Sequence, residues 1–219
     1  MIDVYLFGKN SLAQILATYI THDKTHILRG FTANKQYCTE DEFLGLPLVP
    51  FEDLPTAADS FAIINCMGYS DRLANRVAIF AQISAKKLHL LSYIHPTAVT
   101  IGVTLGDGNI ILPNAVIEPF SVIGMGNVLY GGVYICHDAA IGDNNWFSAG
   151  CVLAGYANVG DRNFFGINSC VKEQTKIGES AIIGAGAVVI RDVADGETVV
   201  GNPAKPLVPP NATASEVAL

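Results

Sequence analysis

From residue 105 to residue 189, every sixth residue of the chain is a large apolar one. A glycine follows directly after every third of them, so these glycines lie eighteen residues apart, from Gly106 to Gly178. Three hexapeptides therefore make one turn of a coil, and such coils bury their apolar faces only by stacking on one another. The pattern predicts a parallel β-helix in which residues eighteen apart in sequence lie about 4.8 Å apart. The fifteen apolar positions are Leu105, Ile111, Ile117, Ile123, Leu129, Ile135, Ile141, Phe147, Leu153, Val159, Phe165, Val171, Ile177, Ile183 and Val189.

Composition narrows the range of partners and compartments. The chain of 219 residues has a formal net charge of -7 and no run of Lys or Arg, which argues against nucleic acid as a partner. It has no long charge-free apolar stretch, so we expect no membrane insertion. It begins without the features of a signal peptide, and its five cysteines form no C-x-x-C pair. We therefore expect a cytoplasmic protein with free thiols.

Residues 1–92 follow a different pattern, which predicts a small Rossmann-like α/β domain. Apolar strand-like runs alternate with helical periodicity, as in a doubly wound βαβαβ sheet. Such sheets bind ligands at the carboxyl ends of their strands, here in the loops that begin at Gly8 and Gly68. Residues 34–55 contain three prolines and are expected to form a loop-rich connection. Strands are expected over 3–8, 25–33, 61–66 and 89–93, and helices from residue 11 and over 71–86.

The β-helix domain is expected over residues 93–194 and an extended tail over 195–219. Stacking should arrange its residues into columns. One column consists of asparagines, whose amides we expect to hydrogen-bond up and down the stack. The column beside it is apolar and should point outward, since the core has its own apolar positions. The asparagines are Asn109, Asn127, Asn145 and Asn163, and the apolar stripe is Ile110, Val128, Trp146, Phe164 and Ile182.

An outward apolar stripe of this length needs something to cover it. We favour a symmetric oligomer as the explanation, with a crevice that lines a ligand as the second possibility. The two explanations are compatible if the crevice lies between subunits.

One histidine lies deep inside the repeat and has the surroundings of a general base. His137 is followed by Asp138, an acid that can orient or charge-balance the imidazole. Gly155 lies eighteen residues further on, so its backbone N–H should lie one coil away from the ring, unshielded by a side chain. A base beside an exposed N–H donor is the minimum that acyl transfer needs. The alternative interpretation is a corner histidine that bonds a neighbouring backbone group.

Several motifs together resemble those of the hexapeptide-repeat acyltransferases, specifically the two-domain bacterial sugar O/N-acetyltransferases of the sialic acid and bacillosamine type. They are the Gly8 loop, M-G-Y-S-D-R at 67–72, I-H-P-T-A-V at 94–99, the repeat, C-H-D at 136–138 and V-G-N-P-A-K at 200–205. The resemblance implies a left-handed β-helix, a homotrimer with active sites between subunits, and an acyl-CoA donor. It also implies that the N-terminal domain binds a nucleotide-linked amino sugar.

The resemblance further implies roles for individual residues. His137 is expected to be the general base with Asp138 as its partner, and Gly155 to supply the N–H for the oxyanion. The expected contacts to CoA are Gly155, Gly166, Ala185 and Lys205, the last near the CoA phosphates. The expected contacts to the nucleotide sugar are Gly8, Lys9 and Asn10 at the pyrophosphate, with Gly68 and Ser70 nearby. No metal is expected.

The chain departs from the family pattern in two places. Family members usually carry Gly-x-Gly-Gly after the first strand, whereas this chain has Gly8-Lys9-Asn10-Ser11, whose lysine can neutralise phosphate as a point charge. Family members also often have histidines near the positions of Trp146 and Tyr156. Their absence leaves His137 as the base of the coil and suggests a more apolar pocket, suited to a deoxysugar or a bulkier acyl group.

We therefore predict an acyl-CoA-dependent N-acyltransferase, with acetyl-CoA as the expected donor. Its substrate is expected to be a nucleotide-linked amino-deoxysugar for bacterial surface glycans such as lipopolysaccharide, attacked directly without an acyl-enzyme. The alternatives are a sugar O-acetyltransferase and a non-catalytic β-helix binding protein. A zinc carbonic anhydrase of the same fold would need three converging histidines, and the coil offers only His95 and His137.

Overall fold

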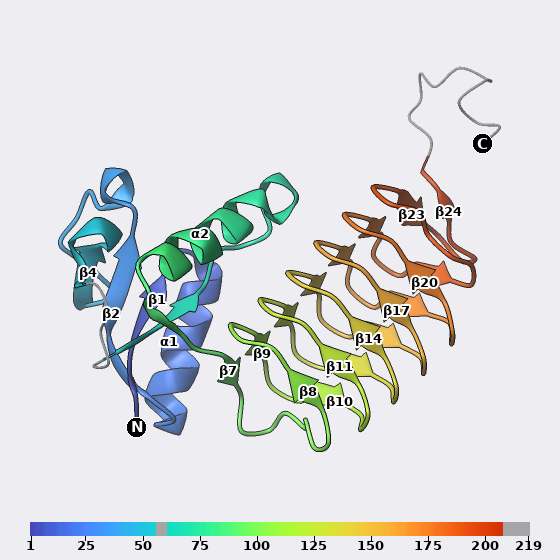
Figure 1. Cartoon of the computed structure of the whole chain (residues 1–219), viewed down its shortest axis with the longest axis horizontal. Helices are drawn as coiled ribbons and strands as arrows, with labels where there is room; N and C mark the ends of the chain where they lie inside the picture. The colour runs from blue at the N-terminus through green and yellow to red at the C-terminus, as the bar shows by residue number, and fades with distance from the viewer. Residues whose placement is uncertain (56–60, 208–219) are drawn as a thin grey trace.

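The hexapeptide repeat forms a stack of parallel coils in the computed structural model, which describes residues 1–55 and 61–207 (Figure 1). Each coil contributes one short strand to each of three sheets, and from β8 to β22 paired residues lie eighteen apart, as Val122 and Ala140 do. These parallel strands fit the predicted left-handed β-helix. We call the three sheets face 1, face 2 and face 3.

Face 1 contains β7 (Tyr93–Ile94), β9 (Ile110–Ile111), β12 (Val128–Leu129), β15 (Trp146–Phe147), β18 (Phe164–Phe165), β21 (Ile182–Ile183), β23 (Thr198–Val200) and β24 (Lys205–Pro206). Face 2 contains β10 (Val116–Ile117), β13 (Tyr134–Ile135), β16 (Val152–Leu153), β19 (Cys170–Val171) and β22 (Val188–Val189). Face 3 contains β8 (Thr104–Leu105), β11 (Val122–Ile123), β14 (Ala140–Ile141), β17 (Asn158–Val159) and β20 (Lys176–Ile177).

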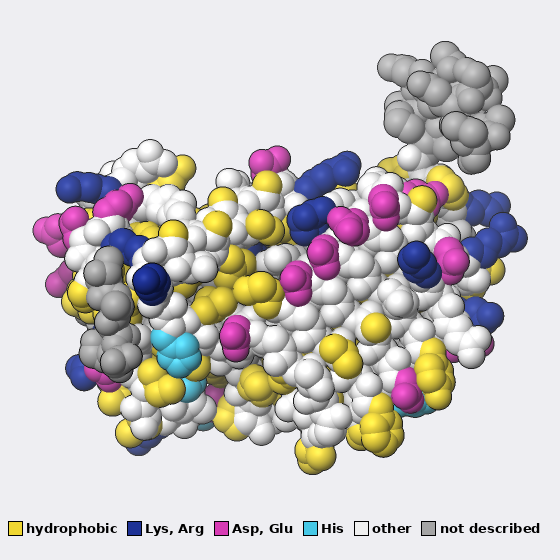
Figure 2. All heavy atoms as spheres, viewed as in Figure 1, with side chains coloured by type: hydrophobic (Ala, Val, Ile, Leu, Met, Phe, Trp, Pro, Cys, Tyr) yellow, Lys and Arg dark blue, Asp and Glu magenta, His cyan; other side chains and the backbone are white. Residues whose placement is uncertain are grey.

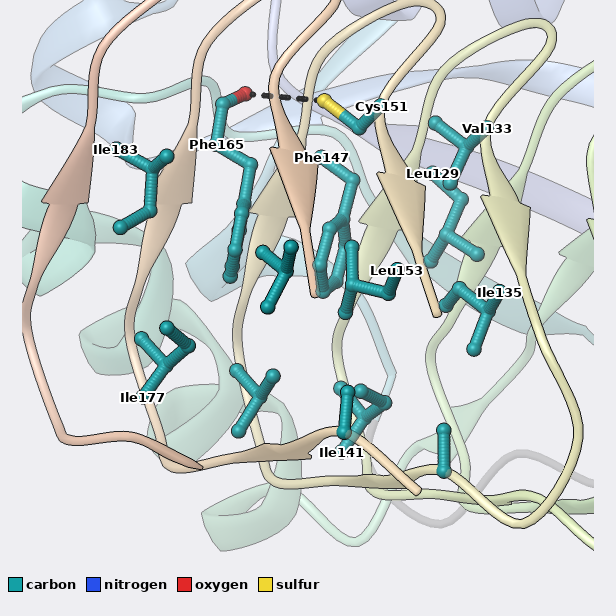
Figure 3. Packing of buried hydrophobic residues seen from close by; sticks show 14 of the residues in the cluster. Leu129, Val133, Ile135, Ile141, Phe147, Cys151, Leu153, Phe165, Ile177 and Ile183 are labelled. Carbon is teal, nitrogen blue, oxygen red and sulfur yellow. Dashed lines mark hydrogen bonds between the residues drawn. The ribbon is translucent and has the colours of Figure 1, made fainter. Parts of the chain in front are cut away.

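The apolar residue of each hexapeptide points into the coil and forms its core (Figure 3). All fifteen positions of the repeat except Leu105, in the first coil, are buried. Phe147 and Phe165 stack on each other with ring centroids 4.6 Å apart. Burying one such side chain contributes about 1.5–3 kcal/mol, and it does so only when the neighbouring coils are in place.

From residue 102 to residue 186, each corner of the coil is turned by a residue with left-handed backbone conformation. On the corner between face 2 and face 3 these residues include Phe120 (φ 68°), Asp138 (φ 57°) and Tyr156 (φ 59°). Aspartate adopts this conformation more readily than most residues do. Because Asp138 is in this turn, its side chain and that of His137 need not project to opposite faces, as neighbours on a strand would.

The asparagine column stabilises the stack, although by a different pattern from the one we expected. Each side-chain oxygen accepts a hydrogen bond from a backbone N–H in the next coil, rather than from the next carboxamide. The Asn127 Oδ1 atom accepts from Asn145 N at 2.8 Å, and its Nδ2 atom donates to the Gly142 carbonyl at 3.0 Å. The column thus satisfies backbone donors at a corner where the strands are interrupted.

The N-terminal part is an α/β sheet with strand order β3-β4-β2-β1-β5-β6. All its strand pairs are parallel except β3 with β4. Its strands are β1 (Asp3–Phe7), β2 (Ile27–Ala33), β3 (Glu42–Phe43), β4 (Leu46–Pro50), β5 (Ala62–Asn65) and β6 (His89–Leu90). Its helices are α1 (Ser11–Asp23) and α2 (Ala74–Ala85), with short 3-10 turns at Lys35–Tyr37, Phe51–Asp53 and Asp71–Leu73.

Three local expectations differ from the structure. Residues 34–55 are not only loop, because β4 pairs with β2 and extends the sheet. The second helix begins at Ala74 rather than residue 71, since Asp71, Arg72 and Leu73 all have left-handed conformation. The strand expected over 89–93 is two strands, of which β6 pairs with β5 and β7 pairs with β9 of the coil.

The apolar stripe on face 1 is largely covered within the chain, which corrects our expectation that it points outward toward a partner. Ile110 and Val128 are fully buried, and Trp146 is 8% exposed. All three belong to one buried cluster with residues of α1 and the N-terminal sheet. Phe164 is half-buried, and its ring lies against that of Tyr69 with centroids 4.2 Å apart. The N-terminal part therefore supplies most of the apolar surface that the stripe requires.

Arg76 of α2 joins the two parts through backbone carbonyls. Its fully buried guanidinium donates from Nε to Gly126 of the coil at 3.1 Å, and from Nη1 to Asn65 at 2.6 Å and Met67 at 3.0 Å. The guanidinium carbon also lies 5.1 Å from the centre of the Phe80 ring. Burial lowers the pKa of Arg76 to about 10, so the side chain stays charged at neutral pH.

A second link joins α1 to the first strand of the coil. The His95 Nε2 atom lies 3.1 Å from the Asp23 carboxylate at the end of α1. The Thr97 backbone N–H donates to His95 Nδ1 at 3.2 Å, which assigns the ring proton to Nε2. The imidazole thus connects the two parts where the chain passes from one to the other.

The far end of the coil is closed by residues that we expected in an extended tail. β23 pairs in parallel with β21, and β24 folds back antiparallel on β23. Residues 208–219 of the expected tail lie outside the described residues. Within the described part of the chain, neither long helix has the length and apolar character needed to cross a membrane.

We predict that Asn127→Ala destabilises the coil by about 1–3 kcal/mol, because it leaves the buried Asn145 N–H without its acceptor. Chemical denaturation followed by circular dichroism measures the change. Asn158→Ala is the matched control, since Asn158 is exposed on face 3. Equal effects of the two substitutions would contradict the structural role of the column.

Candidate functional site

His137 lies on the corner between face 2 and face 3, after β13 and before β14. Its Nδ1 atom lies 2.8 Å from the Asp138 Oδ2 atom, and its side chain is 51% exposed. When Asp138 is ionised, Nδ1 carries the ring proton and donates a hydrogen bond to the carboxylate. Nε2 is then the free acceptor of the ring, as a general base requires.

Gly155 lies directly beside that free nitrogen, one coil further on. A Cβ atom added to Gly155 would lie 3.0 Å from both Nε2 and Cε1 of His137. Among residues 1–55 and 61–207, no backbone hydrogen bond has the Gly155 N–H as its donor. The site therefore combines an oriented imidazole with an unpaired N–H donor.

Tyr156 borders the same corner, whereas Trp146 does not. The Tyr156 ring stands edge-on to His137 with centroids 5.3 Å apart, and it is 53% exposed. Trp146 lies on face 1, where it is buried against Tyr130. Of the two residues expected to make the pocket apolar, only Tyr156 lies at the His137 corner within one chain.

Sequence reasoning missed Glu118, which contacts the His137 corner from the coil below. Its Oε2 atom accepts the His137 backbone N–H at 2.8 Å, and its Oε1 atom accepts the Tyr134 hydroxyl at 2.7 Å. The Tyr134 hydrogen bond and then the His137 N–H hold the pKa of Glu118 below its usual value. The two residues are nineteen apart rather than eighteen, so reading the repeat in columns does not pair them.

Cys136 directly precedes the histidine and carries a thiol, a group that can act as a nucleophile once deprotonated. Burial, followed by the nearby charge of Glu118, raises the pKa of its thiol. A raised pKa lowers the thiolate fraction at neutral pH, so this cysteine is poorly suited to nucleophilic attack.

The residues expected to contact CoA lie further along the coil. Gly166 is buried and packs directly against the backbone of Ala185 in the next coil, so these two are neighbours. Ala185 is exposed at its corner. Lys205 is exposed on β24, at the end of the stack. A side chain at Gly166 would collide with the next coil, which explains the glycine structurally.

A cleft of about 440 Å³ lies at the carboxyl ends of β1 and β5 in the N-terminal part. Gly8, Lys9 and Asn10 line it, whereas Gly68 and Ser70 are not among its lining residues. The Asn10 side chain is already engaged, because its Oδ1 atom caps α1 by accepting Ala13 N at 3.1 Å. Its Nδ2 atom donates to the Cys66 carbonyl at 2.9 Å. Asn10 therefore shapes the loop rather than offering free polar atoms.

The cleft and His137 are not brought together within one chain. Every lining residue of the cleft precedes residue 83. The N-terminal part packs on face 1, whereas His137 lies on the corner that joins faces 2 and 3. That corner is opposite face 1 in a three-sided coil. No group of three or more metal-ligating side chains that could hold an ion occurs in the described ranges.

Comparisons with known proteins found solved structures of similar fold. No protein-family model matches the sequence, and no curated protein matches it. The structure is similar to the acetyltransferase domain of PglB from Neisseria gonorrhoeae, with 25% identity, a TM-score of 0.84, and coverage of 94% of this chain and 100% of that one. It is similar to WeeI from Acinetobacter baumannii, with 22% identity, a TM-score of 0.83, and coverage of 94% and 100%.

A third similar structure is PerB from Caulobacter crescentus, solved in complex with CoA and GDP-perosamine. It shares 24% identity at a TM-score of 0.81 and covers 94% of this chain and 97% of that one. The PglB domain has also been solved with acetyl coenzyme A. These neighbours confirm the resemblance to the sugar acetyltransferases of the β-helix type that the sequence motifs indicated.

We predict that Gly155→Ala displaces the His137 imidazole, because the added methyl group would meet Nε2 and Cε1 at 3.0 Å. The Gly155 backbone is not in the left-handed region, so the fold accommodates alanine. Histidine-ring NMR measures the effect, with the exposed His22 as the internal control. Unchanged His137 ring signals in the variant would show that the two residues are not in contact.

Proposed function

We propose that this protein is an acyl-CoA-dependent N-acyltransferase that acylates the amino group of a nucleotide-linked amino-deoxysugar for bacterial surface glycan biosynthesis. The observation that carries the proposal is the His137 corner, where Asp138 orients the imidazole and Nε2 lies beside Gly155, whose N–H donates no backbone hydrogen bond within the described ranges. The PglB and PerB complexes, which hold acetyl coenzyme A or CoA, support the donor.

The proposed reaction is a direct transfer. The sugar amine attacks the thioester carbonyl carbon, and His137 Nε2 takes the proton that the amine loses. The Gly155 N–H stabilises the negative charge that develops on the carbonyl oxygen. The C–S bond then breaks, and the departing CoA sulfur receives the proton from the imidazolium. Asp138 stabilises that imidazolium through its hydrogen bond to Nδ1.

CoA is proposed to lie along the coil toward its far end. Gly166 and Ala185 lie on successive coils at the corner between faces 1 and 2, where their backbone atoms are proposed to face the pantetheine arm. Gly155 lies at the other end of face 2, at the His137 corner. Lys205 is an exposed cation at the end of the stack and is suited to the CoA phosphates. Acetyl-CoA is the proposed donor.

The N-terminal cleft is the proposed site for the nucleotide sugar. It opens at the start of α1, a helix of 13 residues whose N-terminal N–H groups favour a phosphate. Lys9 adds a positive charge, and its Nζ atom lies 3.9 Å from the Glu40 carboxylate. Gly8 keeps the approach open, since it has φ 126° and no side chain. PerB, solved with GDP-perosamine, supports this class of substrate.

We propose that the catalytic site is completed by a second copy of the chain in a homotrimer. One chain does not join its cleft to its own His137, because the N-terminal part covers the opposite face of the coil. Face 2, beside His137, presents an outward apolar column that this chain does not cover, and Tyr134 and Val152 in it are 37% and 39% exposed. The column comprises Val116, Tyr134, Val152, Cys170 and Val188. Hydrophobic side chains, drawn in yellow, also lie exposed along the lower edge of the coil in Figure 2.

Loss of the base should remove most of the activity. We expect His137→Asn to lower turnover with acetyl-CoA and a nucleotide-linked amino sugar by roughly 10²–10⁴-fold, the usual effect of losing a general base. Release of free CoA thiol measures the rate, with UDP-, dTDP- and GDP-linked amino sugars as substrates. His22→Asn, at an exposed histidine of α1, is the control.

Near wild-type rates in His137→Asn would contradict the role of His137. Transfer to hydroxyl sugars but not to amino sugars would identify O-acetylation instead. CoA binding without transfer to any sugar would favour the non-catalytic alternative.

Disrupting the apolar column should separate the subunits. We expect Val152→Lys to convert the trimer to monomer, because a charge would replace an apolar contact on face 2. Light scattering after gel filtration measures the mass, and turnover should fall together with it. Lys176→Val, on face 3, is the control. A trimer that persists in Val152→Lys would place the interface elsewhere.

A further inference from the structure

We infer that Glu118 is a positioning residue, which fixes the backbone from which the His137 imidazole projects. The inference rests on the proposed function, since it assigns Glu118 a role in the same reaction. It comes from two hydrogen bonds that no feature of the repeat requires. They are His137 N to Glu118 Oε2 at 2.8 Å and the Tyr134 hydroxyl to Glu118 Oε1 at 2.7 Å.

The geometry of the coil leaves a backbone donor unpaired at this position. The equivalent N–H one coil further on belongs to Gly155, which donates no backbone hydrogen bond within the described ranges. In the coil of His137, Glu118 reaches up and occupies that donor. One corner N–H is thus held by a carboxylate, whereas the next, on the buried Gly155, has no backbone acceptor within the described ranges and is the one proposed to receive a substrate oxygen.

The two carboxylates restrain different motions of the same side chain. Glu118 holds the His137 peptide group and thereby the direction of the Cα–Cβ bond. Asp138 holds Nδ1 and thereby the rotation of the ring. In the structure, where both restraints are present, Nε2 is directed toward Gly155. Hydrogen bonds to an ionised acceptor are stronger than neutral ones, which suits a partly exposed corner.

Tyr134 holds the carboxylate in turn. Its hydroxyl occupies the second oxygen of Glu118, so both oxygens have a donor. Without Tyr134 the Glu118 side chain would gain freedom to rotate toward solvent. Tyr134 belongs to the apolar column of face 2 and therefore connects the proposed subunit interface with the position of the base.

The inference is tested by steady-state kinetics of four variants. We expect Glu118→Ala to lower kcat roughly 10–100-fold with little change in KM for either substrate, because the base is misplaced while binding remains. Glu118→Gln keeps an acceptor oxygen for the same N–H, and we expect its kcat within about five-fold of wild type. We expect the kcat of Tyr134→Phe to lie between those of Glu118→Ala and Glu118→Gln. Asp192→Ala is the control, since Asp192 is another exposed carboxylate that accepts a coil N–H, from Lys176 at 2.8 Å.

A second readout does not depend on turnover. The His137 backbone amide signal in NMR should shift in Glu118→Ala and stay near its wild-type position in Glu118→Gln. Wild-type kcat in Glu118→Ala, or equal losses in Glu118→Ala and Glu118→Gln, would overturn the inference. So would an equal loss in Asp192→Ala. An inactive wild-type protein, or an active His137→Asn, would instead refute the proposed function, and the NMR comparison would still test Glu118.

Discussion

The stacking of one coil on the next is the constraint on which the rest of the structure depends. A single coil of eighteen residues buries almost nothing by itself, and its core residues become buried only between two neighbours. Stacking also fixes distances across sequence, since strand partners recur at the same offset. A rigid spacing of this kind places Gly155 against His137 without any loop that must fold correctly. The candidate site is therefore a consequence of the same repeat that builds the core.

Much of the fold could be predicted because each hexapeptide carries its own pattern. The coil, its core residues and the neighbouring positions of His137 and Gly155 follow from counting by eighteen. The packing of the N-terminal part on face 1 does not follow from this counting, because it depends on how a separate part of the chain docks. Arg76 joins the two parts through backbone carbonyls, and no sequence pattern encodes such acceptors. The strand at Leu46–Pro50 was missed because its two prolines, Pro47 and Pro50, resemble those of a loop.

The residues around His137 show where counting by columns fails. Asp138 meets the imidazole only because its backbone is left-handed, which the corner geometry supplies. Glu118 reaches the same corner with its side chain across an offset of nineteen residues, so it lies in a neighbouring column. In the N-terminal part, Gly8 and Lys9 line the cleft as expected, whereas Gly68 and Ser70 do not. Sequence periodicity thus locates backbone atoms well and the reach of long side chains poorly.

The central claim is that a nucleotide-sugar cleft from one chain works with His137 of another. Co-expression of Lys9→Glu, which disables the cleft, with His137→Asn, which disables the base, tests it directly. If the site is shared, mixed oligomers contain intact sites, and random association predicts recovery of about a quarter of wild-type turnover from two variants that are each inactive. If each site is instead built from a single chain, every site in a mixed oligomer carries one of the two defects. The mixture then stays as inactive as its components. That result would contradict the account.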